Sequence, residues 1–385
     1  MIYLDHAAAT PVDSRVLKAM EPYFAEKFYN PSAAYLPAKE VAADYEAAKA
    51  VIAHAIGAKA SDLVMTAGAT EANNLAFTSL SRQIGDDSAL HASVLYLETE
   101  HDSVRRVAMQ HGGIAIRVRP NGLVDLDDLQ SKISDETELI SIALVNNELG
   151  VIQPLTEVAQ IIRTARLDRM RRGVKRQLLL HSDASQALSL LDINVARMGI
   201  DLLTLNAAKV YGPKGVGALY VSHEARIKPL VAGGGQENGL RSGTENVPGV
   251  VGFAKAVELA HEHLNGNRKK YASWRKILLS ELEGYELINR KHTLDNFVVV
   301  SFPGLDAERL VFALEEQAVY VATGAACAAS KGIRSHVLAA IGLSKEQIAG
   351  SLRLTLGETN DEADIHTAAQ IINAVVAKER ERING

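Results

Sequence analysis

The sequence has little of several features that define common classes of protein. It has a single cysteine, Cys327, which excludes an internal disulfide and a metal site made of several cysteines. No uncharged run approaches the roughly 18 apolar residues of a membrane helix, and no basic stretch followed by an apolar one lies at its start. We therefore expect a cytoplasmic protein with no membrane segment, in which Cys327 acts as a free thiol.

The chain also lacks an excess of positive charge. Its 385 residues carry a formal net charge of -5, which argues against a general nucleic-acid-binding surface. One local exception is the stretch 163–176, where seven basic residues are opposed only by Asp168. Such a run is usually a solvated helix face, and the alternative is a docking surface for an acidic protein or RNA.

The first half of the chain alternates between two kinds of pattern. Helix-like and strand-like segments follow each other from about residue 40 to 220, which is typical of a mostly parallel sheet covered by helices. The length predicts about two domains. We expect a large α/β domain over residues 14–255 and a smaller α+β domain made of residues 1–13 and 256–385.

The second half has a different pattern. Two helical segments, 251–263 and 268–282, lead away from the predicted sheet, and an apolar strand follows at 296–302. Small residues and glycines from about 322 to 333 predict a loop that carries Cys327. A mobile loop would suit a cysteine that must contact two different molecules in turn. The alternative is that Cys327 is a small apolar residue buried among alanines.

One lysine stands where a buried strand ends. The apolar run 202–205 predicts a strand that stops at Asn206, and a Gly/Pro turn at 212–215 leads into a second strand at 218–221. Lys209 lies between the two strands. A lysine removed from water favours its neutral amine, which Schiff-base chemistry with a carbonyl requires. Taken alone, an ordinary surface lysine is the more common explanation.

Polar residues also follow other predicted strands. His101 comes after the strand at 94–98, the strand 138–145 leads to Asn147, and Asp183 ends a further apolar run. Open α/β sheets bind their ligands at the carboxyl ends of parallel strands, so these side chains are expected to meet there. Asp183 is either a cap for the next turn or the partner of a buried cation.

A glycine-containing turn adds a candidate phosphate site. The strand 63–66 is followed by Gly68, and a predicted helix opens with Ala69 and Thr70. Free N–H groups at a helix start can hold a phosphate, although an ordinary capped helix start would look the same. Pyridoxal phosphate needs such a site together with a lysine and an acid that keeps its ring nitrogen protonated.

The motifs in order resemble one family along essentially the whole chain. The chain is similar to the group I (NifS/IscS-like) cysteine desulfurases, which are class V, fold-type-I pyridoxal-phosphate enzymes. The motifs that carry the resemblance are Tyr3-Leu-Asp-His-Ala-Ala-Ala-Thr-Pro11, Gly68-Ala-Thr-Glu-Ala-Asn73, Glu100-His101, Asn146-Asn147-Glu-Leu-Gly150, Asp183 with Gln186, Lys209-Val-Tyr-Gly-Pro-Lys-Gly215, Leu240-Arg-Ser-Gly-Thr244 and Cys327. The resemblance implies a homodimer with the two-domain α/β fold described above.

The resemblance implies how pyridoxal 5'-phosphate would be held. Lys209 would form the Schiff base and His101 would stack on the ring. Asp183 would pair with the ring nitrogen, and Gln186 would bond the ring hydroxyl. The phosphate would be bound by residues of this subunit and by one from its neighbour: Ala69, Thr70 and Asn206, and Thr244 of the second copy.

The resemblance also implies the reaction. Asn147 and Arg353 would grip L-cysteine, and a guanidinium suits a bidentate contact with its carboxylate. The Cys327 thiolate would attack the substrate sulfur, leaving L-alanine and a persulfide on Cys327. An acceptor such as an iron–sulfur scaffold or a tRNA-thiolation enzyme would take the sulfur. The alternatives are a related lyase or aminotransferase, such as a selenocysteine lyase, and a weakly active sulfur-relay or binding member.

Three positions depart from the family pattern. A histidine usually precedes the Schiff-base lysine and a serine stands two positions earlier, where this chain has Ala208 and Asn206. An amide can still donate a hydrogen bond, whereas an alanine side chain cannot. We therefore expect a phosphate site that depends more on backbone N–H groups. Tyr35 stands where a histidine is common.

Overall fold

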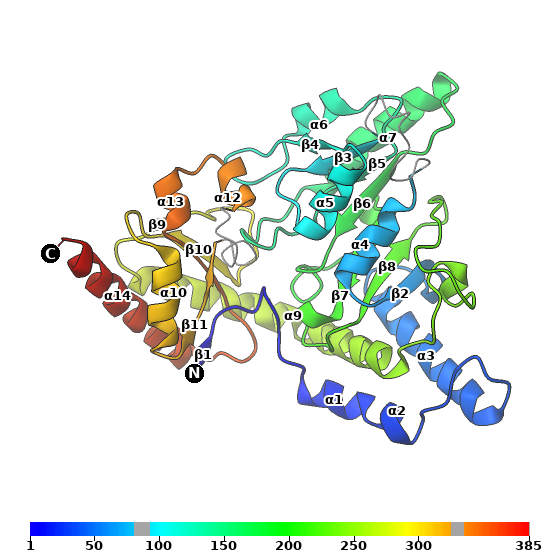
Figure 1. The fold of residues 1–385 in the computed structure, drawn as a ribbon, viewed down its shortest axis with the longest axis horizontal. Coiled ribbons are helices and arrows are strands. Elements are labelled where there is room, and N and C mark those ends of the chain that lie inside the picture. The colour runs from blue at the N-terminus through cyan, green and yellow to red at the C-terminus, as the bar shows by residue number, and fades with distance from the viewer. Residues whose placement is uncertain (81–92, 325–334, 385) are drawn as a thin grey trace.

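The computed structural model describes residues 1–80, 93–324 and 335–384, so Cys327 lies outside the described residues. Figure 1 shows two lobes, each built around a sheet of its own. The predicted fold class, a mostly parallel α/β lobe with a smaller α+β lobe, is confirmed. The predicted division at residue 255 stays a prediction. Within the described ranges, no helix is both long and apolar enough to cross a membrane.

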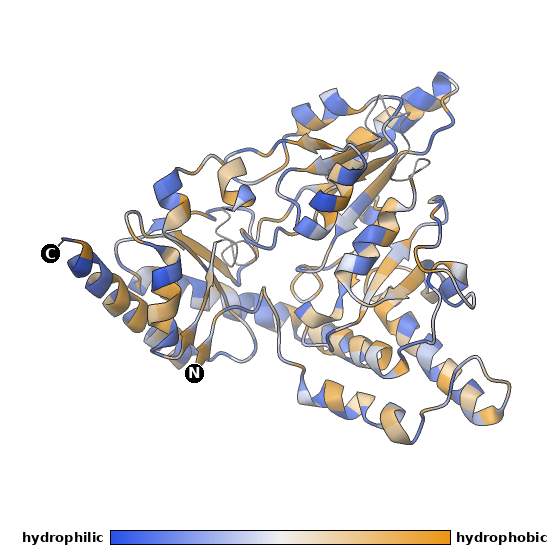
Figure 2. Ribbon diagram, in the orientation of Figure 1, coloured by the Kyte–Doolittle hydropathy of each residue, from blue (hydrophilic) through white to orange (hydrophobic). Residues whose placement is uncertain are grey.

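The large sheet has seven strands in the order β2-β8-β7-β6-β5-β3-β4. Only β8 runs antiparallel to its neighbours, β2 and β7, and the other pairs are parallel. The strands are β2 (Leu63–Thr66), β3 (Val94–Leu97), β4 (Ile114–Ile116), β5 (Leu139–Ser141), β6 (Leu179–Asp183), β7 (Leu202–Asn206) and β8 (Gly217–Val221). Helices cover the sheet, which explains why its central strands are continuous apolar runs (Figure 2).

Helices of the large lobe precede and follow these strands along the chain. The helices are α1 (Ser14–Met20), α2 (Pro22–Ala25), α3 (Leu36–His54), α4 (Ala69–Phe77), α5 (Asp102–Gln110), α6 (Leu126–Lys132), α7 (Leu155–Arg171) and α8 (Val195–Met198). Three 3₁₀ turns are η1 (Ala60–Asp62), η2 (Ala207–Lys209) and η3 (Glu237–Gly239). Parallel strands followed by helices bring α4, α5 and η2 to the same edge of the sheet, where the candidate site lies.

The small lobe holds an antiparallel sheet in the order β12-β13-β10-β9. Its strands are β9 (Glu286–Leu287), β10 (Phe297–Ser301), β12 (Ala322–Thr323) and β13 (Ser351–Thr355), and its helices are α10 (Ala307–Glu315), α12 (His336–Ala340), α13 (Lys345–Ala349) and α14 (Glu362–Asn384). A two-stranded parallel pair joins β1 (Ile2–Tyr3) to β11 (Val319–Tyr320). The N-terminal residues therefore belong to the small lobe before they cross to the large one.

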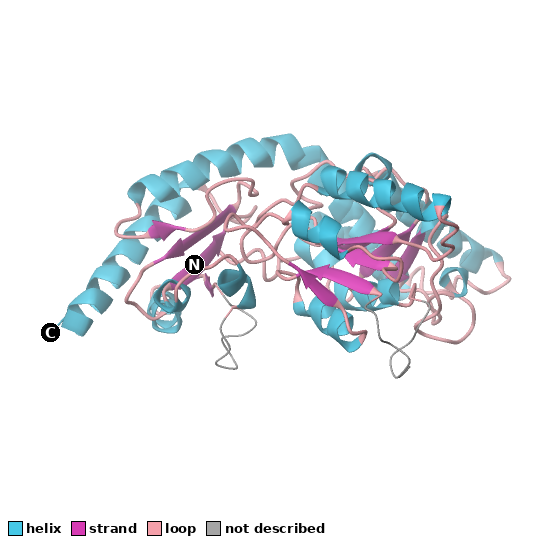
Figure 3. Cartoon of the chain, turned by 90° about the horizontal axis from the view of Figure 1, so that it is seen from above, coloured by secondary structure: helices cyan, strands magenta, loops and turns pink. Residues whose placement is uncertain are grey.

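One helix, α9 (Val247–Glu281), replaces the two helices predicted at 251–263 and 268–282. It packs on α1 and α3 at one end and on α14 at the other, and Figures 1 and 3 show it running from lobe to lobe. The prediction of a break was wrong because Gly266 costs a helix only about 1 kcal/mol. Burial of Leu264 and a hydrogen bond of 2.9 Å from Asn267 to Glu358 hold the helix on either side of that glycine.

The strand predicted at 138–145 is shorter than expected. β5 ends at Ser141, although the backbone of the next residues still bonds to β6. The N–H of Ala143 donates to the side chain of Glu100 at 2.7 Å. The Glu100 side chain thus accepts a hydrogen bond from an N–H group that would bond to a neighbouring strand if β5 continued. Glu100 follows β3, so its polar side chain lies at the edge of the sheet at this point.

The basic stretch 163–176 is largely paired within the chain. Arg166 binds Asp201 at 2.5 Å, and the buried Arg169 donates to the carbonyl oxygen of Thr137 at 2.7 Å. Arg172 and Arg176 pair with an acidic loop, through Asp135 and Glu136 respectively. Four of the seven basic side chains are therefore bound within the chain, three of them in ion pairs, and these contacts fix the end of α7 to the sheet.

Candidate active site

A cavity of about 240 Å³ lies at the carboxyl ends of the central strands. Nine of the predicted site residues line it: Ala69, Thr70, His101, Asn147, Asp183, Gln186, Asn206, Lys209 and Arg353. A larger hollow of about 550 Å³ between α10 and α14 contains none of them. The fold thus brings together residues that are up to 284 positions apart, from Ala69 to Arg353.

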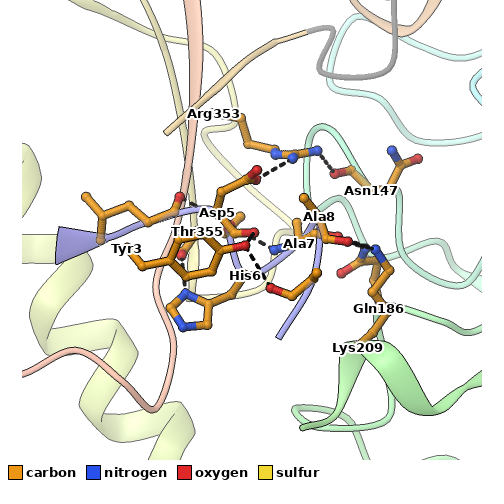
Figure 4. Close-up of polar contacts among 12 residues, drawn as sticks. Tyr3, Asp5, His6, Ala7, Ala8, Asn147, Gln186, Lys209, Arg353 and Thr355 are labelled. Carbon is orange, nitrogen blue, oxygen red and sulfur yellow. Dashed lines mark hydrogen bonds and ion pairs between the residues drawn. The ribbon is translucent and has the colours of Figure 1, made fainter. Parts of the chain in front are cut away.

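Lys209 is presented to the cavity by the turn η2. Asn206 begins this turn, and its Oδ1 accepts the N–H of Ala208 at 3.1 Å. The Nζ of Lys209 donates to the carbonyl oxygens of Ala7 at 2.7 Å and Ala8 at 2.5 Å (Figure 4). A primary amine is thereby held at the cavity wall by backbone acceptors. The oxygen of Asn206 is used as a cap, so its amide group remains as the donor that a phosphate would need.

The same N-terminal segment orients a second side chain. Gln186 donates from Nε2 to the carbonyl oxygen of Ala7 at 2.9 Å, next to the bond from Lys209 (Figure 4). The Thr10 hydroxyl donates to the carbonyl oxygen of Ala208 at 3.1 Å, which ties the segment to η2. Residues 7–10 therefore form part of the cavity rather than a loose terminus.

Asp183, at the end of β6, is buried and has a donor for each oxygen. Asn73 donates to Oδ2 at 2.8 Å, and the N–H of Ser185 donates to Oδ1 at 2.9 Å. The second bond is the turn cap that the sequence allowed, and the first comes from α4. Two donors stabilise the carboxylate form, which is the form that can pair with a protonated ring nitrogen. The motif 68–73 predicts no role for Asn73, because the sequence does not show that this residue is buried.

His101 is fixed as the N-cap of α5. Its Nδ1 accepts the N–H of Ser103 at 3.1 Å and lies 2.9 Å from the Ser103 hydroxyl. A backbone N–H can only donate, so Nδ1 carries no proton and the neutral ring is protonated at Nε2. The ring is therefore held in one tautomer while it lines the cavity.

The start of α4 fits an anion. Gly68 has no side chain to cap the helix and adopts a φ of 139°, which an L side chain rarely adopts. Within the described part of the chain, the N–H groups of Ala69 and Thr70 have no backbone or side-chain acceptor. A helix of nine residues with free first-turn donors attracts a phosphate through its dipole.

Arg353 reaches the cavity from the small lobe. Its Nη1 donates to the carbonyl oxygen of Asn147 at 2.8 Å, and Nη2 pairs with Asp5 at 2.6 Å (Figure 4). The side chain is 3% exposed, and Nε is a buried donor without a partner among the described residues. A carboxylate entering this side of the cavity would meet a guanidinium already held in position.

Two acids near the cavity were not assigned a role from the sequence. Burial raises the pKa of Glu100 to about 8, with a further contribution from the negative charge of Asp183. Burial also raises the pKa of Glu148 to about 7, and the hydroxyl of Ser335 donates to its Oε2 at 2.5 Å. Both acids stand beside predicted residues, but the sequence does not show their burial, which depends on the assembled sheet for Glu100 and includes a contact with Ser335 for Glu148.

Two predicted residues are not among the described residues that line this cavity. Thr244 lines a separate cavity of about 240 Å³ with Glu237 and Arg241, so its contact with a neighbouring subunit's phosphate stays a prediction. Cys327 lies in the stretch 325–334, outside the described residues.

Comparisons with known proteins show the family of the chain. A family model described as Aminotransferase class-V matches residues 2–367. The chain belongs to the class V aminotransferase family. The cysteine desulfurase IscS of Dictyoglomus turgidum is 35% identical over 389 residues, which covers 98% of this chain and 95% of that protein. Cysteine desulfurase IscS 1 of Archaeoglobus fulgidus is 36% identical over 392 residues, which covers 99% of this chain and 98% of that protein.

Solved structures of the class V family share the fold. A NifS-like protein has a TM-score of 0.88 at 31% identity, covering 98% of this chain and 99% of that one. A structure described as SspA in complex with cysteine has a TM-score of 0.78 at 32% identity, covering 92% of this chain and 99% of that one. The resemblance to NifS/IscS-like proteins within the class V family is thereby confirmed.

Proposed function

We propose that this chain is a cysteine desulfurase that uses pyridoxal 5'-phosphate to convert L-cysteine to L-alanine and leaves the sulfur on Cys327. The observation that carries the proposal is the meeting of Lys209, Asp183 and the start of α4 on one cavity, with Arg353 entering from the other lobe. An amine, a carboxylate and an anion site suit the carbonyl, ring nitrogen and phosphate of this cofactor. When bound, pyridoxal phosphate supplies an electron sink for bonds at the substrate's amino carbon.

Different residues of the chain would bind different parts of the cofactor. Ala69 and Thr70 offer backbone donors to the phosphate, and Asn206 adds an amide. Asp183 would form an ion pair with the protonated ring nitrogen, and Gln186 lies where it could reach the ring hydroxyl. His101, held in one tautomer by Ser103, offers its flat ring to the cofactor. These roles match the sequence-based assignments, and their support is that all six residues line one cavity.

The substrate side of the cavity suits an amino acid. Arg353 and Asn147 would receive the carboxylate of L-cysteine, and the Lys209 amine would move the proton at its amino carbon. The carbon–sulfur bond of the substrate breaks and a sulfur–sulfur bond forms on Cys327. The carbon keeps the electron pair and takes up a proton, which gives alanine. A relative is known in complex with cysteine, which supports this choice of substrate.

A homodimer completes the proposal. Apolar side chains stand exposed between α1 and the start of α3, and exposed apolar surface commonly marks an interface: Leu17, Phe24, Phe28, Tyr35 and Leu36. In a dimer, Thr244 of one copy would approach the phosphate of the other. The persulfide would then pass to a cytoplasmic acceptor, such as an iron–sulfur scaffold or a tRNA-thiolation enzyme.

Product analysis tests the proposal. Purified protein loaded with pyridoxal phosphate should release alanine from L-cysteine, and mass spectrometry should find one added sulfur atom on Cys327. Cys327→Ala should lose turnover while it keeps the visible absorption band of the cofactor. Absence of alanine despite a bound cofactor would favour a related lyase or aminotransferase. Absence of the cofactor band in wild type would favour a binding or relay protein.

A further inference from the structure

A row of buried polar side chains crosses three neighbouring strands and leads to the cavity. Ser141 of β5, His181 of β6 and Thr204 of β7 are each 0% exposed in a largely apolar sheet. His181 lies 2.8 Å from the Ser141 hydroxyl through Nδ1 and 3.1 Å from the Thr204 hydroxyl through Nε2. Polar groups in a protein interior are costly unless they are paired, so this row is a connected network.

The row ends at Glu100, which lines the cavity and is 0% exposed. Its Oε1 accepts the N–H of Ala143 at 2.7 Å and lies 3.5 Å from the Ser141 hydroxyl. Its Oε2 is buried and has no hydrogen-bond partner among the residues that the structure describes. The N–H groups of Ala143 and His101 favour the ionised form, but burial and the charge of Asp183 outweigh them, and Oε2 has no direct donor. This environment therefore favours the neutral acid, protonated on Oε2.

The neighbouring acid has the opposite environment. Asp183 has a donor on each oxygen, from Asn73 and from the N–H of Ser185. The negative charge of Asp183 and burial together raise the pKa of Glu100 to about 8. Burial lowers the pKa of His181 to about 4, so the imidazole of the row is neutral and does not neutralise either acid. Two adjacent acids with such different surroundings are expected to hold different protonation states.

We propose that Glu100 is a positioning residue of the site, a neutral carboxylic acid beside which Asp183 alone carries the negative charge for a pyridinium nitrogen. This inference rests on the proposed function, since a pyridinium is what the single charge would pair with. Ionisation of Glu100 would place a second negative charge next to Asp183. The row of Ser141, His181 and Thr204 holds the buried side chain of Glu100 in place.

Other charged or titratable groups surround Glu100. His101 follows it directly, and His336 lies 3.0 Å from the Glu100 carbonyl oxygen through Nε2. Lys209 and Arg353 line the same cavity but are held by Ala7, Ala8, Asn147 and Asp5, as described above. The hydrogen bonds and the ion pair described above join these cations to groups other than the Glu100 carboxyl.

The experiment compares wild type with Glu100→Gln, which keeps the shape and is always neutral. Glu98→Gln is the matched control, because Glu98 lies two residues earlier and binds the N–H of Val118 at 2.6 Å. The thermal midpoint of each is measured from about pH 5 to about pH 9, without cofactor and with pyridoxal phosphate, together with the visible absorption band.

The expected result follows from the sign of the pKa change. A native pKa above the unfolded value stabilises the native state at low pH, and this contribution is lost as pH rises through about 8. The midpoint of Glu100→Gln relative to wild type should therefore rise from pH 5 toward pH 8 and then level off. The difference for Glu98→Gln should lack this rise. Glu100→Gln should keep the cofactor band at neutral pH.

Two results would overturn the inference. A midpoint difference between Glu100→Gln and wild type that is independent of pH would show that Glu100 holds no extra proton in the native state. Loss of the cofactor band in Glu100→Gln, but not in Glu98→Gln, would show that the negative charge of Glu100 is needed. If wild type binds no pyridoxal phosphate, the proposed function fails and with it the role toward a pyridinium. The cofactor-free midpoints still report separately whether Glu100 keeps its proton.

Discussion

Nη2 of Arg353 lies 2.6 Å from Oδ1 of Asp5, so the arginine expected to bind the substrate carboxylate is already paired with a carboxylate of the chain. The two residues come from β13 and from the N-terminal segment, 348 positions apart. The pair fixes the plane of the guanidinium before any substrate arrives. Pre-set geometry of this kind reduces the entropy that binding must overcome.

The first prediction concerns this guanidinium. Arg353→Lys should raise KM for L-cysteine by about tenfold to a hundredfold, because a point charge replaces a planar fork and a charge-assisted hydrogen bond of about 1.5–3 kcal/mol is lost. The change in kcat should be smaller, since the lost contact holds substrate and transition state alike. Steady-state kinetics measure both constants. Arg309→Lys, at an exposed pair with Glu379, is the control and should leave both unchanged.

A second prediction separates capping from cofactor binding at Asn206. Asn206→Ala removes the cap on the Ala208 N–H and should cost about 1 kcal/mol of stability. It should also weaken pyridoxal phosphate binding, because the amide donor in the cavity is lost. Asn194→Ala removes a similar cap, on the Arg197 N–H at the start of α8, and should cost stability alone. Equal cofactor affinity in the two variants, measured by fluorescence titration, would contradict a role for Asn206 in the site.

The buried pair between Lys49 and Glu237 gives a third prediction. Both side chains are 5% exposed, and Lys49 Nζ lies 3.1 Å from Glu237 Oε2. Lys49→Met should cost about 3–5 kcal/mol, because it leaves a buried carboxylate without its cation. Lys27→Met breaks the exposed pair with Asp44 and should cost less than about 1 kcal/mol. Denaturant unfolding compares the two variants.

The same pair anchors the loop that carries Thr244. Glu237 also accepts the N–H of Met65 at 2.8 Å and the hydroxyl of Tyr45 at 2.5 Å, so the loop is fixed to β2 and α3. If Thr244 serves a neighbouring subunit, Lys49→Met should also release pyridoxal phosphate more readily than Lys27→Met. Equal cofactor retention in the two folded variants would argue against that use of Thr244.

A fourth prediction concerns pH and the start of α12. Burial raises the pKa of Glu148 to about 7, above that of an unfolded chain, so its contribution to stability is present at low pH and lost as pH rises through 7. Glu148→Gln should therefore lose less stability, relative to wild type, at pH 8 than at pH 5. Thermal midpoints at the two pH values test this, and an equal loss at both would show that Glu148 does not hold the extra proton.

A variant of Ser335 tests the hydrogen bond between its hydroxyl and Glu148. Its Oγ donates to Glu148 and accepts the N–H of Leu338, at 3.0 Å, as the cap of α12. Ser335→Ala should cost about 1–3 kcal/mol, because a buried acceptor loses its donor as well as the cap. Ser344→Ala removes only a cap, on the Gln347 N–H of α13, and should cost about 1 kcal/mol. Equal losses would contradict a bond between Ser335 and Glu148.

Much of the fold and most of the site follow from local sequence patterns. The strands around Lys209 and Asp183 are apolar runs that end in polar residues, so their order predicted a shared sheet edge, and the structure places both residues on one cavity. The continuity of α9 does not follow from the local pattern, because long-range packing holds the helix together across Gly266. The protonation of Glu100 could not be predicted, since burial and the approach of Asp183 depend on the assembled sheet.

The most direct test of the account is to find which lysine carries the cofactor. Protein loaded with pyridoxal phosphate is reduced with borohydride, digested and analysed by mass spectrometry. The account predicts a pyridoxyl group on Lys209, whose Nζ reaches the cavity, and loss of the visible band in Lys209→Ala. A pyridoxyl group on another lysine, such as the exposed Lys214 five residues later, or an unchanged band in Lys209→Ala would contradict it.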